Sequence, residues 1–191
     1  MRLEVDIASK SVRAANGAAV EVLRDVRISL GEGQIGAILG PSGCGKTTLL
    51  KCIAGLDPDY AGRVELPGAG RIGMVFQEPR LLPWRTVEEN IRLPAPLASD
   101  EAIAQLYAVL HLADHRYHFP GELSLGLARR VALARAFAVE PELLLLDEPF
   151  VSLDAPLAAQ LRRELAALVS RQPLTTLLVT HDASEAAALA D

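Results

Sequence analysis

One stretch of the chain decides its fold: Gly40-Pro41-Ser42-Gly43-Cys44-Gly45-Lys46-Thr47-Thr48. It matches the pattern G-x-x-x-x-G-K-[ST], which is typical of a phosphate-binding loop. Glycines let the backbone wrap closely, so that successive N–H groups point at phosphate oxygens. In such a loop Lys46 would reach the β- and γ-phosphates, and the hydroxyl of Thr47 would bind Mg²⁺. All of these residues are therefore predicted to contact a nucleoside triphosphate.

The segments on either side of the loop support this interpretation. The apolar run Ile35–Leu39 indicates a buried strand that leads into the loop. Leu49 and Ile53 share one face of a helix predicted over about Lys46–Ala54, and Gly55 can end it. This helix would direct its positive N-terminal end at the phosphates. The alternative, a glycine-rich turn with an incidental lysine, does not explain a strand before and a helix after.

Length, composition and charge restrict the class of protein. The chain has 191 residues, half of them hydrophobic, which suits a single domain over residues 1–191. No apolar run approaches the ~18 residues that cross a bilayer, and Met1–Asp6 alternates like a half-buried strand rather than a signal-peptide core. Two cysteines, one in the loop, favour a reduced cytosol. The net charge of −5 argues against a nucleic-acid partner.

The rest of the chain alternates strand and helix patterns. Strands are predicted from apolar alternation or short apolar runs over residues 3–7, 26–30, 71–76, 143–146 and 175–180. The first two indicate an N-terminal antiparallel sheet, and the others a mainly parallel sheet with helices on both faces. Residues 1–77 and 141–191 would form this core with the antiparallel sheet.

Residues 78–140 show no clear strand pattern and are interrupted by prolines. Thr86 and Glu89 form a capping-box pair that would open a short helix. We therefore expect a helical subdomain inserted into the sheet domain. Beyond it, Asp154 can cap a helix, and the alanine-rich end of the chain also favours a helix.

Polar residues follow three of the predicted strands, at the edge where parallel sheets bind ligands. Asp147 is suited to hold Mg²⁺ and Glu148 to polarise the water that attacks the γ-phosphate. His181 could hold that water in line, and Gln77 could complete the Mg²⁺ shell. Taken alone, Asp-Glu-Pro suits a solvated turn, and lone His and Gln residues suit a surface. The phosphate-binding loop makes a shared site the better interpretation.

Together these motifs resemble the nucleotide-binding subunit of an ATP-binding cassette (ABC) transporter over nearly the whole chain, which implies an α/β P-loop NTPase fold. The family's landmarks occur in order, as Walker A (Gly40–Thr48), Q-loop (Gln77), signature (Leu123–Leu127), Walker B (Leu143–Asp147, then Glu148), D-loop (Ser152–Asp154) and switch histidine (His181). The resemblance implies an ATP hydrolase that needs ATP and Mg²⁺. Lys46, Glu148 and His181 would be catalytic, and Thr47, Gln77 and Asp147 would bind the metal.

The resemblance also implies partners. Two cassettes, identical or different, would pack head to tail, so that Ser124, Gly126 and Asp154 of one subunit complete the ATP site of the other. Residues 78–92 would receive a helix of a membrane permease. Trp84 is a candidate contact there, and the alternative places it in the subdomain core.

A narrower similarity covers Leu81–Val87 and Arg130–Ala136, which resemble bacterial importers of the nitrate, sulfonate and taurine group. It implies import with an extracytoplasmic solute-binding protein, and a peripheral position on the cytoplasmic face of the inner membrane. Two alternatives remain: a weakly hydrolysing binding module, and a non-transport ABC ATPase. The intact Lys46 and Glu148 argue against the first, and the absence of long coiled coils or of a second cassette argues against the second.

The chain departs from the family pattern at three places. In Leu123-Ser124-Leu125-Gly126-Leu127, leucines replace a glycine and a polar residue of the usual L-S-G-G-Q, so we expect slower hydrolysis or looser dimerisation. Val12 stands where the family stacks an aromatic on adenine, so we expect weaker binding and poor base discrimination. The sequence ends at Asp191, where relatives usually continue, so we expect a compact or shortened chain without a regulatory C-terminal domain.

Overall fold

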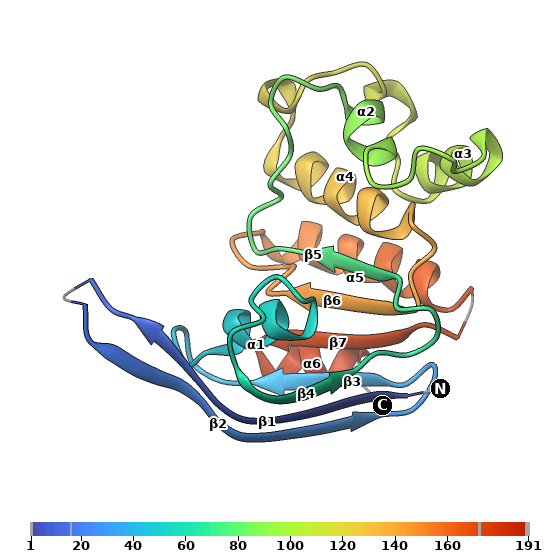
Figure 1. Cartoon of the computed structure of the whole chain (residues 1–191). Coiled ribbons are helices and arrows are strands. Elements are labelled where there is room, and N and C mark those ends of the chain that lie inside the picture. The colour runs from blue at the N-terminus through green and yellow to red at the C-terminus, as the bar shows by residue number, and fades with distance from the viewer. Residues whose placement is uncertain (1, 16, 172, 190–191) are drawn as a thin grey trace.

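The computed structural model describes residues 2–15, 17–171 and 173–189, which form two sheets and a group of helices (Figure 1). One sheet is antiparallel in the order β2–β1–β4, and the other is parallel in the order β3–β7–β6–β5. The strands are β1 (Leu3–Arg13), β2 (Ala19–Leu30), β3 (Ile35–Leu39), β4 (Ala61–Glu65), β5 (Ile72–Val75), β6 (Leu143–Asp147) and β7 (Thr175–Thr180). The predicted N-terminal antiparallel sheet and parallel core sheet are both confirmed.

The helices are α1 (Lys46–Ile53), α2 (Val87–Arg92), α3 (Asp100–Val109), α4 (Leu125–Phe137), α5 (Ala155–Val169) and α6 (Ala183–Leu189), with short 3₁₀ turns η1 (Ala113–His115) and η2 (Pro120–Glu122). None of the described helices combines the length and the apolar composition that a bilayer crossing requires.

Strand β6 shows how the sheet is covered on both faces. Every residue of β6 is buried, and successive leucines point to opposite sides. Leu143 and Leu145 belong to a core shared with α1 and the antiparallel sheet, whereas Leu144 and Leu146 belong to a core shared with α4 and α5. The expectation of helices on both faces of the sheet is confirmed. On the face that carries α1, residues of the antiparallel sheet also pack against the parallel sheet.

The parallel register brings the carboxyl ends of the strands to one edge. Leu39 pairs with Thr180, and Asp147 pairs with Val179. At the other end of the sheet order, Val75 of β5 pairs with Leu146. The phosphate-binding loop and the residues that follow β5, β6 and β7 are therefore neighbours in space, as the sequence pattern predicts for a ligand-binding edge.

Residues 78–140 contain α2, α3, η1, η2 and α4 and no strand, and they form the upper layer in Figure 1. The capping box of Thr86 and Glu89 is present at the start of α2. Asn90 is fully buried, and its amide bonds to the backbone of Leu82, Arg85 and Thr86. These bonds hold the turn that carries Trp84.

Trp84 itself is 71% exposed, so the interpretation that placed it in the subdomain core is wrong. The turn is organised by the buried Asn90 beneath it and not by burial of the indole ring.

Strand β4 was not anticipated from the sequence. Its pairing with β1, for example Val64 with Val5, depends on a partner far away in the chain.

Candidate active site

The phosphate-binding loop joins β3 to α1 and depends on glycine at its last position. Gly45 has φ +100° and caps α1. A Cβ at this position would lie 2.7 Å from the carbonyl oxygen of Val22 on β2, so a larger residue is excluded by both strain and space. Because Gly45 has no side chain to cap α1, the first N–H groups of that helix stay available for an anion.

Lys46 is nearly buried and held across the loop. Its ammonium nitrogen Nζ donates to the carbonyl oxygens of Gly40 (2.7 Å) and Pro41 (2.8 Å). It also lies 3.5 Å from Oε1 of Glu148. The loop therefore places a positive charge directly beside a carboxylate from the end of β6.

Thr47 and Asp147 form the second contact between the loop and β6. The hydroxyl of Thr47 donates to Oδ1 of Asp147 at 3.1 Å. Asp147 is almost fully buried, and this burial raises the pKa of its carboxyl, with the nearby charge of Glu148 adding to the rise. A bound cation would reverse that effect, so the buried carboxylate and the hydroxyl suit a magnesium ion.

The number of protein ligands also fits magnesium. Within the described part of the chain, no group of three or more His, Cys, Asp or Glu side chains could hold a metal ion. Mg²⁺ is usually held by one or two carboxylates together with waters and substrate phosphates, and so needs no such group. The residues Thr47, Asp147 and Gln77 are compatible with that coordination.

Glu148 adopts a left-handed backbone conformation with φ +46°. Such a conformation costs on the order of 1–3 kcal/mol for a residue other than glycine and is often found at functional sites. Its N–H still bonds to the carbonyl oxygen of Val179 (2.8 Å), so the chain turns directly at the strand end. This turn is the bend that lets Asp147 and Glu148 face the same site.

His181 follows β7 and completes a chain of charged and polar groups. Its Nδ1 lies 3.0 Å from Oε2 of Glu148, whose other oxygen is the one near Lys46. Because the histidine side chain is about half exposed and the glutamate is buried, the pair stands between the protein interior and solvent.

A cavity of about 240 Å³ lies over this arrangement. It is lined by Val22, Ser42, Gly43, Gly45, Lys46, Thr47, Thr48, Gln77 and Glu148. Gly40 and Pro41 contribute carbonyl groups to Lys46, and Cys44 is exposed on the loop. Val22 was not identified from the sequence, because nothing local distinguishes it from the other valines of its strand.

Nine predicted residues are not part of this cavity lining. Five of them belong to the loop or contact a lining residue, namely Gly40, Pro41, Cys44, Asp147 and His181. The other four are Val12, Ser124, Gly126 and Asp154, which lie elsewhere in the chain. Val12 pairs with Val20 at the far end of β1. Asp154 caps α5, its Oδ1 accepting from the N–H of Leu157 (3.0 Å). Ser124 caps α4 in the same way, and Gly126 is buried where a Cβ would lie 2.8 Å from the side chain of Leu157.

The two unusual leucines of the signature region differ in their surroundings. Leu125 is 43% exposed at the first turn of α4. Leu127 is partly buried and packs against the core shared by α4 and α5. Only Leu125 therefore presents an apolar side chain at the start of this helix.

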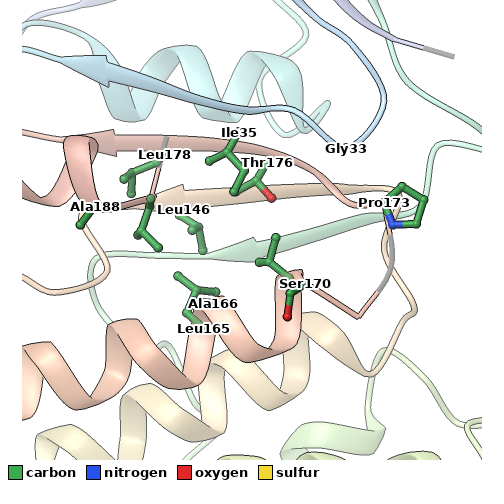
Figure 2. A pocket seen from close by; sticks show the side chains of 12 residues that line it. Gly33, Ile35, Leu146, Leu165, Ala166, Ser170, Pro173, Thr176, Leu178 and Ala188 are labelled. Atoms are coloured by element: carbon green, nitrogen blue, oxygen red, sulfur yellow. The ribbon is translucent and has the colours of Figure 1, made fainter. Parts of the chain in front are cut away.

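A second cavity, of about 420 Å³, lies between α5, α6 and the sheet and is lined mainly by apolar side chains (Figure 2). Leu146 and Leu178 come from the sheet, and Leu165 and Ala166 come from α5. None of the predicted site residues lines it. The polar cavity at the loop is therefore the better candidate for an active site.

Comparisons with known proteins identify the family of the chain. Residues 23–151 match the family model described as "ABC transporter". The chain is 46% identical over 171 residues to the aliphatic sulfonates import ATP-binding protein SsuB 2 of Pseudomonas syringae pv. tomato, covering 89% of this chain and 73% of that protein. Its identity to the SsuB 2 protein of Frankia alni is 48% over 184 residues, covering 95% and 73%.

A solved structure of an ATP-binding cassette indicates the same family. The dimeric ATP-binding cassette MJ0796, bound to ADP and Pi in a post-hydrolysis state, superposes with a TM-score of 0.85 at 28% identity. The match covers 98% of this chain and 91% of that one. The loop, the strand-end residues and these similarities show that the chain belongs to the ABC transporter family, as an ATP-binding cassette that hydrolyses ATP.

Proposed function

We propose that this cassette drives solute import by hydrolysing Mg·ATP at the phosphate-binding loop, with two copies or two related subunits closing on the nucleotide. The observation that carries the proposal is the contact of Glu148 with both Lys46 and His181 beside the start of α1. A buried carboxylate placed next to a phosphate site is suited to general-base chemistry.

In the proposed reaction the γ-phosphate lies against the N–H groups of α1 and the ammonium of Lys46. Lys46 now donates to carbonyls of its own loop, so a side-chain rotation would suffice to bring it onto the phosphate. Thr47, Asp147 and Gln77 would hold Mg²⁺, which when bound offsets the negative charge of the phosphate oxygens.

Glu148 would polarise the attacking water, and His181 would keep that water and the γ-phosphate in line. The bond from the water oxygen to phosphorus forms as the bond to ADP breaks, which yields ADP and phosphate. Stabilisation of the charge that develops on phosphate would come from Lys46 and the N–H groups of α1.

The second half of the site would come from a partner cassette. Ser124 and Gly126 at the start of α4, together with Asp154, lie outside the cavity of their own subunit. A head-to-tail dimer would place them against the partner's nucleotide. The γ-phosphate would then stabilise the closed dimer, and its loss would release it.

An exposed aromatic surface is the proposed contact with the membrane permease. It consists of Trp84, Tyr117 and Phe119, which are 71%, 71% and 45% exposed. Their two segments are joined by backbone bonds, from Val87 N–H to His118 O (2.9 Å) and from Glu88 N–H to Arg116 O (3.0 Å). Aromatic side chains with a polar rim are typical of protein interfaces.

The direction of transport is inferred from relatives that are 41–48% identical and are named as aliphatic sulfonate import proteins. It would place the cassette on the cytoplasmic face of the inner membrane, with an extracytoplasmic solute-binding protein as a further partner. Aliphatic sulfonates are the first solutes to test, because the ATP site itself carries no information about the solute.

The variant Glu148→Gln tests the ATPase mechanism. We expect it to bind ATP and to form a stable ATP-dependent dimer, while the wild type hydrolyses ATP and the dimer dissociates. Size-exclusion chromatography with Mg·ATP and phosphate release provide the two measurements. A wild type that binds ATP without turnover, and behaves like the variant, would instead indicate a binding module.

A further inference from the structure

Arg129 of α4 is a buried arginine that none of the predicted roles uses. It is 4% exposed, and its guanidinium lies under the turn that follows β6. Nη1 donates to the carbonyl oxygens of Pro149 (2.5 Å) and Glu148 (3.4 Å), and Nη2 donates to the carbonyl oxygen of Val151. One side chain thus contacts three backbone carbonyls of the turn that begins at Glu148.

This turn contains two unfavourable backbone conformations. Glu148 has φ +46° and Ser152 has φ +62°. The bonds within the turn are long, from Val151 N–H to Glu148 O and from Leu153 N–H to Phe150 O, both 3.3 Å. Strained conformations persist only where the surroundings hold them, and here the charged donor from α4 provides that hold.

The environment of Arg129 is costly for a charge. Burial lowers the pKa of its guanidinium, and Glu185 is the acidic group whose charge opposes that shift. Among the described residues, Nε has no hydrogen-bond partner. By contrast, the neighbouring Arg130 pairs directly with Glu164 through two bonds. A buried charge that bonds mainly to neutral carbonyl groups adds little to stability. The role of Arg129 is therefore better explained by the backbone turn that it orients.

We propose that Arg129 is a positioning residue for ATP hydrolysis, an inference that rests on the proposed role of Glu148. Its guanidinium holds the turn so that the Glu148 carboxylate stays between Lys46 and His181. Because Arg129 lies on the helix that Ser124 caps, it also ties this carboxylate to the helix end that would meet the partner's nucleotide.

The test is a kinetic comparison of Arg129→Met with the wild type. Methionine keeps much of the length and apolar contact but removes every donor. We expect kcat for ATP hydrolysis to fall between about tenfold and a hundredfold, the range that small misplacements of a catalytic group produce. The KM for ATP should stay within about threefold, because the hydrogen bonds of Arg129 go to the turn after β6 and not to the phosphate-binding loop.

Two further variants separate positioning from folding. Arg129→Lys retains a charged donor and should recover part of the lost kcat, which keeps the test usable if Arg129→Met does not fold. Arg71→Met removes a guanidinium that also donates to a backbone carbonyl, that of Glu140 (2.9 Å), at the opposite end of β5 from Gln77. This control should keep kcat within about twofold.

A double-mutant cycle decides whether Arg129 acts through Glu148. In single-turnover phosphate release, Arg129→Met should reduce the residual rate of Glu148→Gln by less than about twofold. Full additivity of the two losses, an equal effect on KM and kcat, or no effect of Arg129→Met on kcat would each overturn the proposal. If Glu148→Gln hydrolyses ATP like the wild type, the role proposed for Glu148 fails, whatever Arg129→Met does.

Discussion

The starts of α1 and α4 are both helix N-termini that the proposed function places against phosphate, yet they are built differently. At α1 the cap is Gly45, which offers no side chain, so the N–H groups remain available. At α4 the hydroxyl of Ser124 accepts from Leu127 N–H, and the exposed Leu125 follows it. In the proposed function, the first terminus is complete within one chain, whereas the second would meet nucleotide only in a dimer.

The two termini also use glycine for different reasons. Gly45 is required by a positive φ and by the carbonyl of Val22, so it shapes the loop itself. Gly126 is buried where α4 approaches Leu157 of α5, so its small size serves packing in the same chain. A motif residue can therefore have a structural cause even where a nucleotide contact is also proposed.

The largest effect is expected from a substitution at the start of α1, which leaves the start of α4 unchanged. Lys46→Ala removes the charge at the α1 terminus and should lower ATP hydrolysis by a factor on the order of 10²–10³, since it removes transition-state stabilisation. Steady-state phosphate release would measure it. Activity within tenfold of the wild type would mean that the loop does not carry the chemistry.

A smaller effect is expected on the affinity for ATP, from the position predicted to contact the adenine base. Val12→Tyr should strengthen ATP binding by ~0.5–1.5 kcal/mol if an aromatic at that position stacks on adenine. The wild type should discriminate ATP from GTP by less than tenfold, because valine offers no stacking. Titration with both nucleotides would check this. Val12 does not line the loop cavity. If Val12→Tyr leaves the affinity for ATP unchanged, the residue at this position does not contact adenine.

Leu125→Gly tests the terminus of α4. Removing the exposed side chain should let the partner's phosphate approach the helix backbone, and we expect kcat to rise about threefold, as the loss of less than ~1 kcal/mol of hindrance would give. ATPase rates at protein concentrations that saturate the dimer provide the measurement. An unchanged or lower rate would show that Leu125 does not obstruct the nucleotide.

The smallest expected effect concerns stability. Burial raises the pKa of Asp147 above its ordinary value of 3.8, so the folded chain disfavours the charged form, and stability falls as pH rises through the interval between the two values. Asp147→Asn should therefore raise Tm at pH 7, because asparagine has no charge to bury.

The advantage of Asp147→Asn should shrink as pH falls and vanish below 3.8, where the aspartate is neutral in both the folded and the unfolded state. Thermal melts without nucleotide across this pH range would show it. If the Tm difference is constant with pH, burial of the charge is not its cause.

The sequence predicted the parallel sheet, the antiparallel sheet and the helical insertion well, because their signals are local. The run Leu143–Asp147 and the capping box at Thr86 needed no distant partner to be identified. Strand β4 was missed because its pairing with β1 is long-range. The exposure of Trp84 could not be read from the sequence, because it depends on the buried Asn90 beneath the turn.

By itself, the sequence determined the order of the elements, the phosphate-binding loop and the polar residues at three strand ends. These follow from local spacing and from the rule that parallel strands end at one edge. Only the tertiary structure decided that Glu148 reaches both Lys46 and His181, and that Arg129 holds its turn. Those contacts join residues far apart in the chain and depend on a strained φ, which no local pattern encodes.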